Sequence, residues 1–475
     1  RRYPLNMLKK IMVIIIALVC LMSISSISAE DVDVIADTND GTFANLQSAI
    51  NNASGTLTLN QNYANNGSES VITINKNITI DGKGHIIDAK GVSQIFTIGG
   101  GVCVTLNNIT FLNGNATTGG AIYNDECNVA VTDSIFINTT AGSGSAIFSY
   151  KGSLNVSGSN FTDTTAYAGG AIYGSGSVTV INSTFKDITA NDDGGVIYSA
   201  GYDLVVSNSI FINTQGRYGG AIFSYDDNFT VTDSIFINTT STNYGGAICT
   251  YGGNFTVTNS TFKNTKSSNW GGAIFRSSAV CNFTVADSTF INTTGSYGGA
   301  IYANNNGDFI VSNSSFINTT TTNSGGAIYS SNNIRNFAVI DSNFINTASK
   351  GTNGAGGGAI FSNGNVTVTN STFTDTTSLA GDGGAIYNPG NVTVTDSIFN
   401  NTMSLNDGGA IHGGNVTVNN SRFIDNAAIS GKGASIYTQS GLKLKDSTFN
   451  SPNADGNSII HINSTNNDDV NLTNN

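Results

Sequence analysis

The stretch GGAIYANNNGDFIVSNSSFINTT, from Gly298 to Thr320, contains two phrases that recur along most of the 475-residue chain. The first is Gly-Gly-Ala-Ile, which returns every 25 to 32 residues. Its ten strict copies start at Gly119, Gly169, Gly219, Gly245, Gly271, Gly298, Gly325, Gly357, Gly383 and Gly408, and three variants start at Gly144, Gly194 and Gly433. A period of this length indicates a solenoid, a propeller or another array of repeats.

The second phrase, Phe-x-Asn or Phe-x-Asp, keeps the same period and follows a run of alternating residues. NVTVTDSIF, from Asn391 to Phe399, alternates Val with Thr, which predicts a strand with Val inward and Thr outward. We expect Phe and the Asn two residues later to share the inward face. About 25 residues hold about three short strands, whereas a propeller blade needs about 40 residues.

We therefore predict an all-β protein, a right-handed parallel β-helix whose coils stack about 4.8 Å apart. Each coil covers the apolar side of the next. One inward column is expected to contain Ile122, Ile172, Ile222, Ile301 and Ile386, and another Phe136, Phe211, Phe236 and Phe316.

The chain divides into four segments. Residues 1–29 have the layout of a signal peptide, with Met7 as the start, a basic Lys9-Lys10 pair, an apolar run and cleavage after Ala29; the alternative is an uncleaved membrane anchor. Residues 30–110 form an N-terminal cap and the first coils, and Thr42 to Ala53 is the capping helix. Residues 111–450 are the repeated coils, and 451–475 are a partial coil with a polar tail.

The composition excludes some classes of function. Only 11% of the residues are charged, and 31 acidic residues outnumber 19 basic ones. Nucleic-acid binding needs clustered Lys and Arg residues, so we do not expect this protein to bind nucleic acid. Cys103, Cys127, Cys249 and Cys281 form no CxxC motif and read as buried small side chains, with a Cys103–Cys127 bridge left open.

These phrases resemble the repeats of two known groups of surface proteins. The Gly-Gly-Ala-Ile repeats resemble those of chlamydial polymorphic outer membrane proteins, and NITIDGKGHIID, from Asn77 to Asp88, resembles the opening of adhesin-like proteins of methanogenic archaea. The resemblance covers nearly all of residues 40–450. It implies a secreted or cell-surface protein that attaches to glycans, hosts or neighbouring cells. Because no second apolar span follows residue 30, we expect no integral membrane domain in the mature chain.

The rival interpretation is a polysaccharide-active enzyme of the pectate lyase or polygalacturonase type, which shares the fold. Such an enzyme needs charged catalytic residues gathered in one cleft. We find no Asp pair that meets a His and a Lys or Arg at matching places in adjacent coils, although His412 replaces an aromatic residue in one coil. We predict no catalytic residue, no metal site and no cofactor.

A column of Asn and Asp stands three residues before the Phe residues and reads as a row of turns. Its Asp residues never occupy successive coils, which avoids repulsion between neighbouring carboxylates. Asn-x-Ser/Thr sites are frequent. The better glycosylation candidates lie before outward Thr residues, whereas Asn residues of the Phe-x-Asn phrase are expected to point inward. The candidates are Asn228, Asn254, Asn282 and Asn391.

Binding is expected along the residues that follow Gly-Gly-Ala-Ile, because eleven of these thirteen are aromatic. If Ile points inward, strand alternation turns the next ring outward. Such a ladder would bind a carbohydrate or a cell-surface protein. The alternatives are that the rings fill the core while Ile faces out, or that the glycines bend the strand so that both are buried. The candidate ligand-binding residues are Tyr123, Tyr173, Tyr198, Phe223, Phe275, Tyr302, Tyr329, Phe361 and Tyr387.

Overall fold

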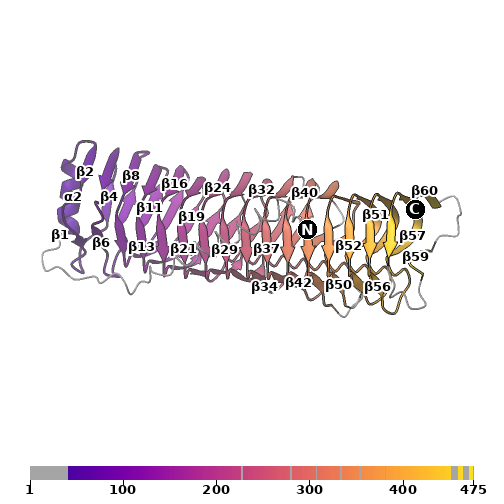
Figure 1. Cartoon of the computed structure of the whole chain (residues 1–475). Coiled ribbons are helices and arrows are strands. Elements are labelled where there is room, and N and C mark those ends of the chain that lie inside the picture. The colour runs from indigo at the N-terminus through magenta and orange to yellow at the C-terminus, as the bar shows by residue number, and fades with distance from the viewer. Residues whose placement is uncertain are drawn as a thin grey trace, which may run out of the picture.

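The structure is a computed structural model that describes most of the repeated region (Figure 1). The described residues are 41–225, 228–278, 281–305, 307–331, 334–351, 356–379, 381–450, 458–463 and 470–473. The predicted signal peptide lies outside them. So do much of the predicted tail and residues 352–355, which belong to the widest gap between repeats.

Each repeat forms one coil of a parallel β-helix. A coil in the middle of the rod contains β27 (Ile222–Ser224), β28 (Asn228–Thr232), β29 (Ile235–Ile237) and β30 (Thr240–Tyr244). Equivalent strands of successive coils pair in parallel, as β27 does with β31 (Ile248–Thr250). The pairing builds sheets of 30, 17 and 13 strands that run along the rod. The first sheet takes two strands from each coil, which explains why a coil has four strands where about three were predicted.

Near the C-terminal end of the rod, the two strands of the first sheet join into one. This gives β51 (Ile386–Thr395), β54 (Ile411–Asn419) and β57 (Ile436–Lys445). The last described strands, β59 (Ile460–Ile462) and β60 (Val470–Thr473), both pair with β57. They form the final partial coil that the sequence predicts.

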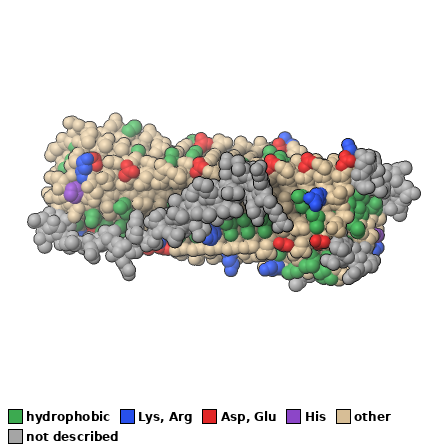
Figure 2. All heavy atoms as spheres, in the orientation of Figure 1, with side chains coloured by type: hydrophobic (Ala, Val, Ile, Leu, Met, Phe, Trp, Pro, Cys, Tyr) green, Lys and Arg blue, Asp and Glu red, His purple; other side chains and the backbone are tan. Residues whose placement is uncertain are grey.

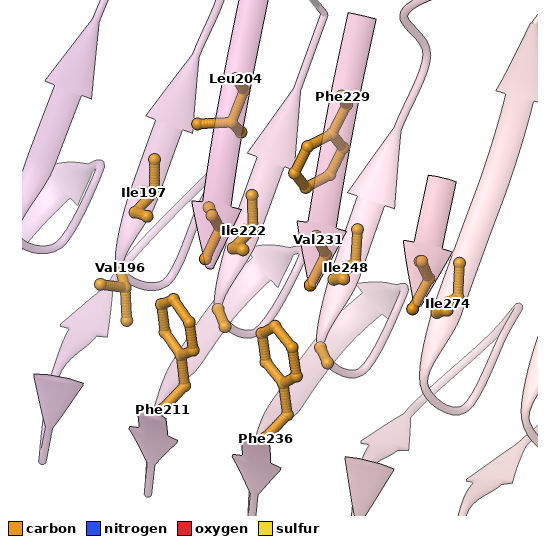
Figure 3. Packing of buried hydrophobic residues seen from close by; sticks show 14 of the residues in the cluster. Val196, Ile197, Leu204, Phe211, Ile222, Phe229, Val231, Phe236, Ile248 and Ile274 are labelled. Carbon is orange, nitrogen blue, oxygen red and sulfur yellow. The ribbon is translucent and has the colours of Figure 1, made fainter. Parts of the chain in front are cut away.

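The core is built from columns of identical side chains, as predicted. Figure 3 shows Ile197, Ile222, Ile248 and Ile274 in one column, with Phe211 and Phe236 in another. All nine residues predicted to form the Ile and Phe columns are fully buried. In NVTVTDSIF, Val392 and Val394 are buried while Thr393 and Thr395 are partly exposed, so the predicted alternation is confirmed.

The two glycines of the phrase have different tasks. Gly245 has a φ of 64°, a left-handed conformation that favours glycine. Gly246 has no such torsion, but a Cβ placed on it would lie 2.0 Å from the carbonyl oxygen of Gly272 in the next coil. The first glycine therefore makes the corner, and the second lets neighbouring coils approach.

The Asn of Phe-x-Asn does not share the inward face of Phe, and this prediction is wrong. Asn238 has a φ of 54°, so the strand alternation ends there and its side chain turns outward. Its Nδ2 donates to Oδ1 of Asn213 in the previous coil at 3.0 Å. Four Asn residues of this phrase are consequently exposed instead of inward, namely Asn138, Asn238, Asn292 and Asn318.

The column of Asn and Asp before Phe forms turns, as predicted. Asn259 has a φ of 48°, and its amide donates to the Asp233 carboxylate in the preceding coil. The same Asn-to-Asp bond joins Asn313 to Asp287, Asn370 to Asp341 and Asn420 to Asp396. Alternation of the two residue types therefore supplies each of these carboxylates with a donor instead of a second negative charge.

The N-terminal end of the rod is covered by α2 (Phe43–Asn52), which matches the predicted capping helix (Figure 1). Thr42 caps the helix by accepting a hydrogen bond from the N–H of Asn45. The helix buries its own side chains Phe43, Leu46 and Ile50. The described residues contain no helix that is long and apolar enough to cross a membrane.

Cys103 and Cys127 are not joined by a disulfide, so the bridge that was left open is not formed. Cys103 is exposed, whereas Cys127 is buried and its sulfur accepts the N–H of Val102 at 3.3 Å. Cys249 is buried as predicted, but Cys281 is only partly buried.

Candidate functional site

The residues that follow Gly-Gly-Ala-Ile lie outside the main core. In β27, Ile222 faces the interior while Phe223 turns to the other side, where it packs in a second hydrophobic cluster. The alternative that the rings fill the core in place of Ile is therefore wrong. These rings form a column that we call the aromatic ladder. It contains Tyr123, Phe148, Tyr173, Tyr198, Phe223, Phe275, Tyr302, Tyr329, Phe361, Tyr387 and Tyr437.

Rings in successive coils of the ladder stack on one another. Tyr173 and Tyr198 have centroids 4.5 Å apart, and Tyr329 and Phe361 have centroids 4.7 Å apart with planes 3° from parallel. Offset stacking of this kind stabilises aromatic pairs by about 0.5–1.5 kcal/mol beyond their burial. The ladder is interrupted where Cys249 stands between Phe223 and Phe275.

A second row of rings flanks this interruption and covers the ladder. Tyr244 stacks on Trp270 with centroids 4.7 Å apart, and Trp270 stacks on Tyr302 at 4.9 Å. We call this row the outer aromatic patch, and all its members are partly exposed. The patch consists of Tyr218, Tyr244, Tyr251, Trp270 and Tyr297.

The patch changes which of the predicted binding residues are accessible. Phe223 and Phe275 are buried, and Tyr302 is 9% exposed. The other predicted rings, Tyr123, Tyr173, Tyr198, Tyr329, Phe361 and Tyr387, are partly exposed. In the middle of the rod, the accessible aromatic surface is therefore the outer patch, which sequence reasoning missed. Its signal is the aromatic residue directly before the glycines in YGG and WGG.

The tyrosines of this surface stay uncharged to high pH. Burial raises the pKa of Tyr302 to about 12, and burial also raises the pKa of Tyr244. At one end, the Arg217 guanidinium lies over the Tyr218 ring at 4.9 Å and pairs with Asp192 at 3.0 Å. Figure 2 shows that hydrophobic side chains gather at a few places on a face with few charges. Contact with a partner would therefore depend on ring faces and hydrogen bonds.

The four candidate glycosylation residues, Asn228, Asn254, Asn282 and Asn391, are all exposed. Their side chains also bond along the rod. Nδ2 of Asn228 donates to Asp203 at 2.9 Å, and Oδ1 of Asn391 accepts from Asn415 at 3.0 Å. A glycan at these positions would have to displace such bonds.

A separate cluster of ionisable groups lies near the C-terminal end of the rod. Asp382, Asp407 and His412 present ligand-type atoms that all lie within 4.8 Å of one another. His412 Nδ1 is 3.4 Å from Asp382 Oδ2. Burial raises the pKa of Asp382 and lowers that of His412, because a charge on either group is poorly solvated there.

The expectation was that no Asp pair meets a His together with a Lys or Arg in adjacent coils, and this cluster supplies the Asp pair and the His. Asp382 and Asp407 both directly precede the glycines of their coils, at the place that Tyr244 and Trp270 hold in the outer patch. Lys432 occupies the same place one coil later, and its backbone N–H donates to Asp407 Oδ1 at 2.7 Å. The signal for the cluster was the change of residue type in two columns at the same coils.

A surface depression of about 370 Å³ lies between successive turns in the N-terminal half of the rod. Its lining contains one basic side chain and neither a carboxylate nor an imidazole. The lining residues are Lys90, Gly91, Asn113, Gly114, Asn115, Asn138 and Thr140. A pair of acids for glycoside hydrolysis is therefore not present in this depression.

Comparison with known proteins supports the fold. Residues 271–449 match the family model described as right handed beta helix region. Together with the three parallel sheets, this match shows a right-handed parallel β-helix. Comparison with curated proteins gives no match to the chain.

Proposed function

We propose that this chain is a non-enzymatic, secreted or cell-surface adhesin-like protein that binds an extended carbohydrate or surface-protein segment along its outer aromatic patch. One observation carries the proposal. Tyr218, Tyr244, Trp270 and Tyr297 stand at the same place in four consecutive coils and are partly exposed. Contiguous exposed aromatic surface on a soluble protein usually marks an interaction site.

The geometry of the patch favours a long partner over a small one. Coils repeat about every 4.8 Å, so aromatic faces recur at short intervals along a straight line. Tyr and Trp combine a broad apolar face with a polar group at the rim, which suits contact with the C–H faces and hydroxyl groups of sugars. A row of such rings binds several successive units of a chain with weak contacts that add together.

The regularity of the coils supports display over catalysis. A solenoid copies one surface many times, whereas an active site needs a unique arrangement of groups. The resemblance to adhesin-like proteins, the predicted signal peptide and the exposed sequons support a place outside the cell. Protease treatment of intact cells should then release peptides of this protein, and its detection in the cytosol alone would contradict a surface location.

The second candidate function is a polysaccharide-active enzyme of the pectate lyase or polygalacturonase type. It is favoured by the cluster of Asp382, Asp407 and His412, which brings acids and an imidazole together. Burial of His412, which is 4% exposed, speaks against direct contact with a sugar. Release of soluble oligosaccharides from pectin-like polymers by the purified protein, and its loss in His412→Tyr, would favour this candidate.

The binding proposal is tested with rings that can be removed without opening the main core. The double variant Tyr244→Ala/Trp270→Ala removes two neighbouring members of the patch. Tyr202→Ala is the matched control, because Tyr202 is 69% exposed and does not belong to the patch. Binding to a panel of immobilised glycans and to intact cells is measured, with thermal unfolding to verify that each variant is folded.

We expect the double variant to bind about tenfold or more weakly, since a central aromatic contact is commonly worth more than 1 kcal/mol. The control should bind like the unchanged protein. Equal binding by the folded double variant would refute the patch as the binding surface.

A further inference from the structure

In two columns of the repeat, polar residues replace aromatic ones in adjacent coils near the C-terminal end of the rod. Asp382 and Asp407 replace the outer ring before the glycines, and His412 replaces a ring of the aromatic ladder. Asp407 and His412 belong to one coil, and Asp382 belongs to the coil before it. Three polar groups are thereby gathered where other coils place aromatic rings.

Backbone bonds position the two carboxylates. Oδ1 of Asp382 accepts the N–H of Asp407 at 3.0 Å, and Oδ1 of Asp407 accepts the N–H of Lys432 at 2.7 Å. Within the described part of the chain, neither carboxylate forms an ion pair with Lys or Arg. Each acid thus keeps an oxygen available close to the imidazole, and their negative charge lacks a fixed basic partner.

The imidazole is held by its neighbours on both faces. His412 lies between Tyr387, with centroids 5.0 Å apart, and Tyr437, at 4.7 Å, with its ring tilted against both. Its side chain is almost completely buried, and Nδ1 has no hydrogen-bond partner although it faces Asp382 Oδ2. A buried ring nitrogen without a hydrogen bond is costly unless another group occupies it.

The neighbouring Gln439 is compatible with either tautomer of His412. Its side-chain amide nitrogen lies 3.2 Å from His412 Nε2. Since amide oxygen and nitrogen are interchangeable in orientation, a rotated amide accepts the Nε2–H of His412 through its oxygen. In that orientation Nδ1 presents a lone pair toward two carboxylates, and a set of three such acceptors suits a cation.

We propose that His412 Nδ1 and the carboxylates of Asp382 and Asp407 bind a divalent transition-metal ion of the zinc type. Imidazole combined with carboxylate suits Zn²⁺ and its neighbours, whereas Ca²⁺ and Mg²⁺ prefer oxygen ligands alone. Ligand bonds of about 2.0–2.2 Å put two ligands of one tetrahedral ion about 3.3 Å apart. The Nδ1–Oδ2 distance of 3.4 Å agrees with this separation.

The site would have three protein ligands, and a fourth position would remain for water or a partner group. Because the ligands come from two coils, the ion joins these coils in addition to their backbone ladder. Binding of an ion to the folded state alone raises the stability of that state. The metal is therefore expected to raise the unfolding temperature of the C-terminal end of the rod.

The test uses the full chain after treatment with a chelator, titrated with ZnCl₂ in a calorimeter. His412→Tyr is the central variant, because Tyr already occupies this ladder position in neighbouring coils and should preserve the fold. Asp407→Asn removes a carboxylate at constant size. His461→Tyr is the control, since His461 also stacks on Tyr437 but lies outside the cluster.

We expect one Zn²⁺ per chain, at least tenfold weaker binding by His412→Tyr and Asp407→Asn, and unchanged binding by His461→Tyr. Absorption of bound Co²⁺ should report imidazole ligation and disappear in His412→Tyr. Absence of saturable Zn²⁺ binding, binding of equal strength by His412→Tyr, or binding of Ca²⁺ in preference to Zn²⁺ would overturn the proposal. If His412→Tyr failed to fold, equal binding by folded Asp407→Asn would overturn it as well.

Discussion

The ring of Phe236 lies parallel to that of Phe262 one coil later, with an interplanar angle of 0° and centroids 4.8 Å apart. Both side chains are fully buried, and the same stacking continues along the 17-stranded sheet from Phe111 to Phe449. A coil therefore depends on its two neighbours for the environment of its own Phe. The stability of each coil therefore depends on the coils that stack on either side of it.

Replacement of Phe236 by Ala should strongly destabilise the protein. The change leaves a cavity between two rings and is expected to lower the free energy of unfolding by about 3–5 kcal/mol. Phe236→Leu retains most of the volume and should cost less. Thermal unfolding followed by circular dichroism measures both. An unchanged transition in Phe236→Ala would contradict the packing of this column.

Substitution in a column of buried Thr residues should stabilise the protein instead. The hydroxyl oxygen of Thr239 is buried and has no hydrogen-bond partner, and the same holds for Thr214 and Thr265 in neighbouring coils. Val has the shape of Thr without the hydroxyl group. Because a buried hydroxyl without a partner costs about 1–3 kcal/mol, Thr239→Val should raise the free energy of unfolding by about 1 kcal/mol.

Ser234 gives the matched control for Thr239. Its Oγ accepts the N–H of Ser209 at 3.2 Å and donates to the carbonyl of Thr232 at 2.8 Å. Ser234→Ala would leave the buried N–H of Ser209 without its partner, so we expect a loss of about 1–3 kcal/mol. The two substitutions should move the denaturant midpoint in opposite directions. A loss of stability in Thr239→Val would indicate that its hydroxyl group has a partner in solution.

The columns could be predicted from sequence because the same type of residue recurs at each inward position in many repeats. Ile222 and Phe236 recur with the period, so one correct assignment fixes the whole column. The outward turn of Asn238 was missed because a left-handed residue ends the alternation on which the prediction rested. The outer patch was missed because the residue before the glycines varies, from Asp193 to Trp270. The cluster around His412 required distances between columns, which a period does not supply.

Asp193 should make stability dependent on pH. Burial, together with a smaller contribution from the nearby Asp192, raises the pKa of this half-buried carboxyl group from its ordinary value of 3.8 to about 6, although Arg217 opposes the shift. The folded protein therefore holds the proton more tightly than the unfolded chain. Its contribution to stability is full below about pH 4 and is lost as the pH rises to about 6.

Asp193→Asn removes this titration while it retains the shape of the side chain. The variant should be more stable than the unchanged protein above pH 6, by about 1 kcal/mol once solvent screening of a half-exposed group is considered. The difference should vanish below about pH 4. Asp203→Asn is the control, because Asp203 is an exposed residue at the start of a strand. A constant difference between Asp193→Asn and the unchanged protein across pH 4–8 would contradict the raised pKa.

Arg276 is a charged side chain inside the rod. It is fully buried, at a position where the neighbouring coils have Thr250 and Ala303, and burial lowers its pKa to about 10. The guanidinium donates through one nitrogen to the carbonyl oxygen of Gly252 at 2.6 Å and through another to that of Gly253. These bonds to backbone oxygens offset part of the cost of removing the charge from water.

Replacement of Arg276 by Ala should lower the free energy of unfolding by about 2–4 kcal/mol. The change empties a large volume and leaves two carbonyl groups of the preceding turn without their donors. Arg276→Lys should cost less than Ala but more than zero, because an ammonium group cannot span both carbonyls as the planar guanidinium does. Arg276→Met separates volume from hydrogen bonding, since it fills the space but donates nothing. We expect Met to rank between Lys and Ala in denaturant unfolding, and a Met variant as stable as the unchanged protein would show that the two bonds contribute no net stability.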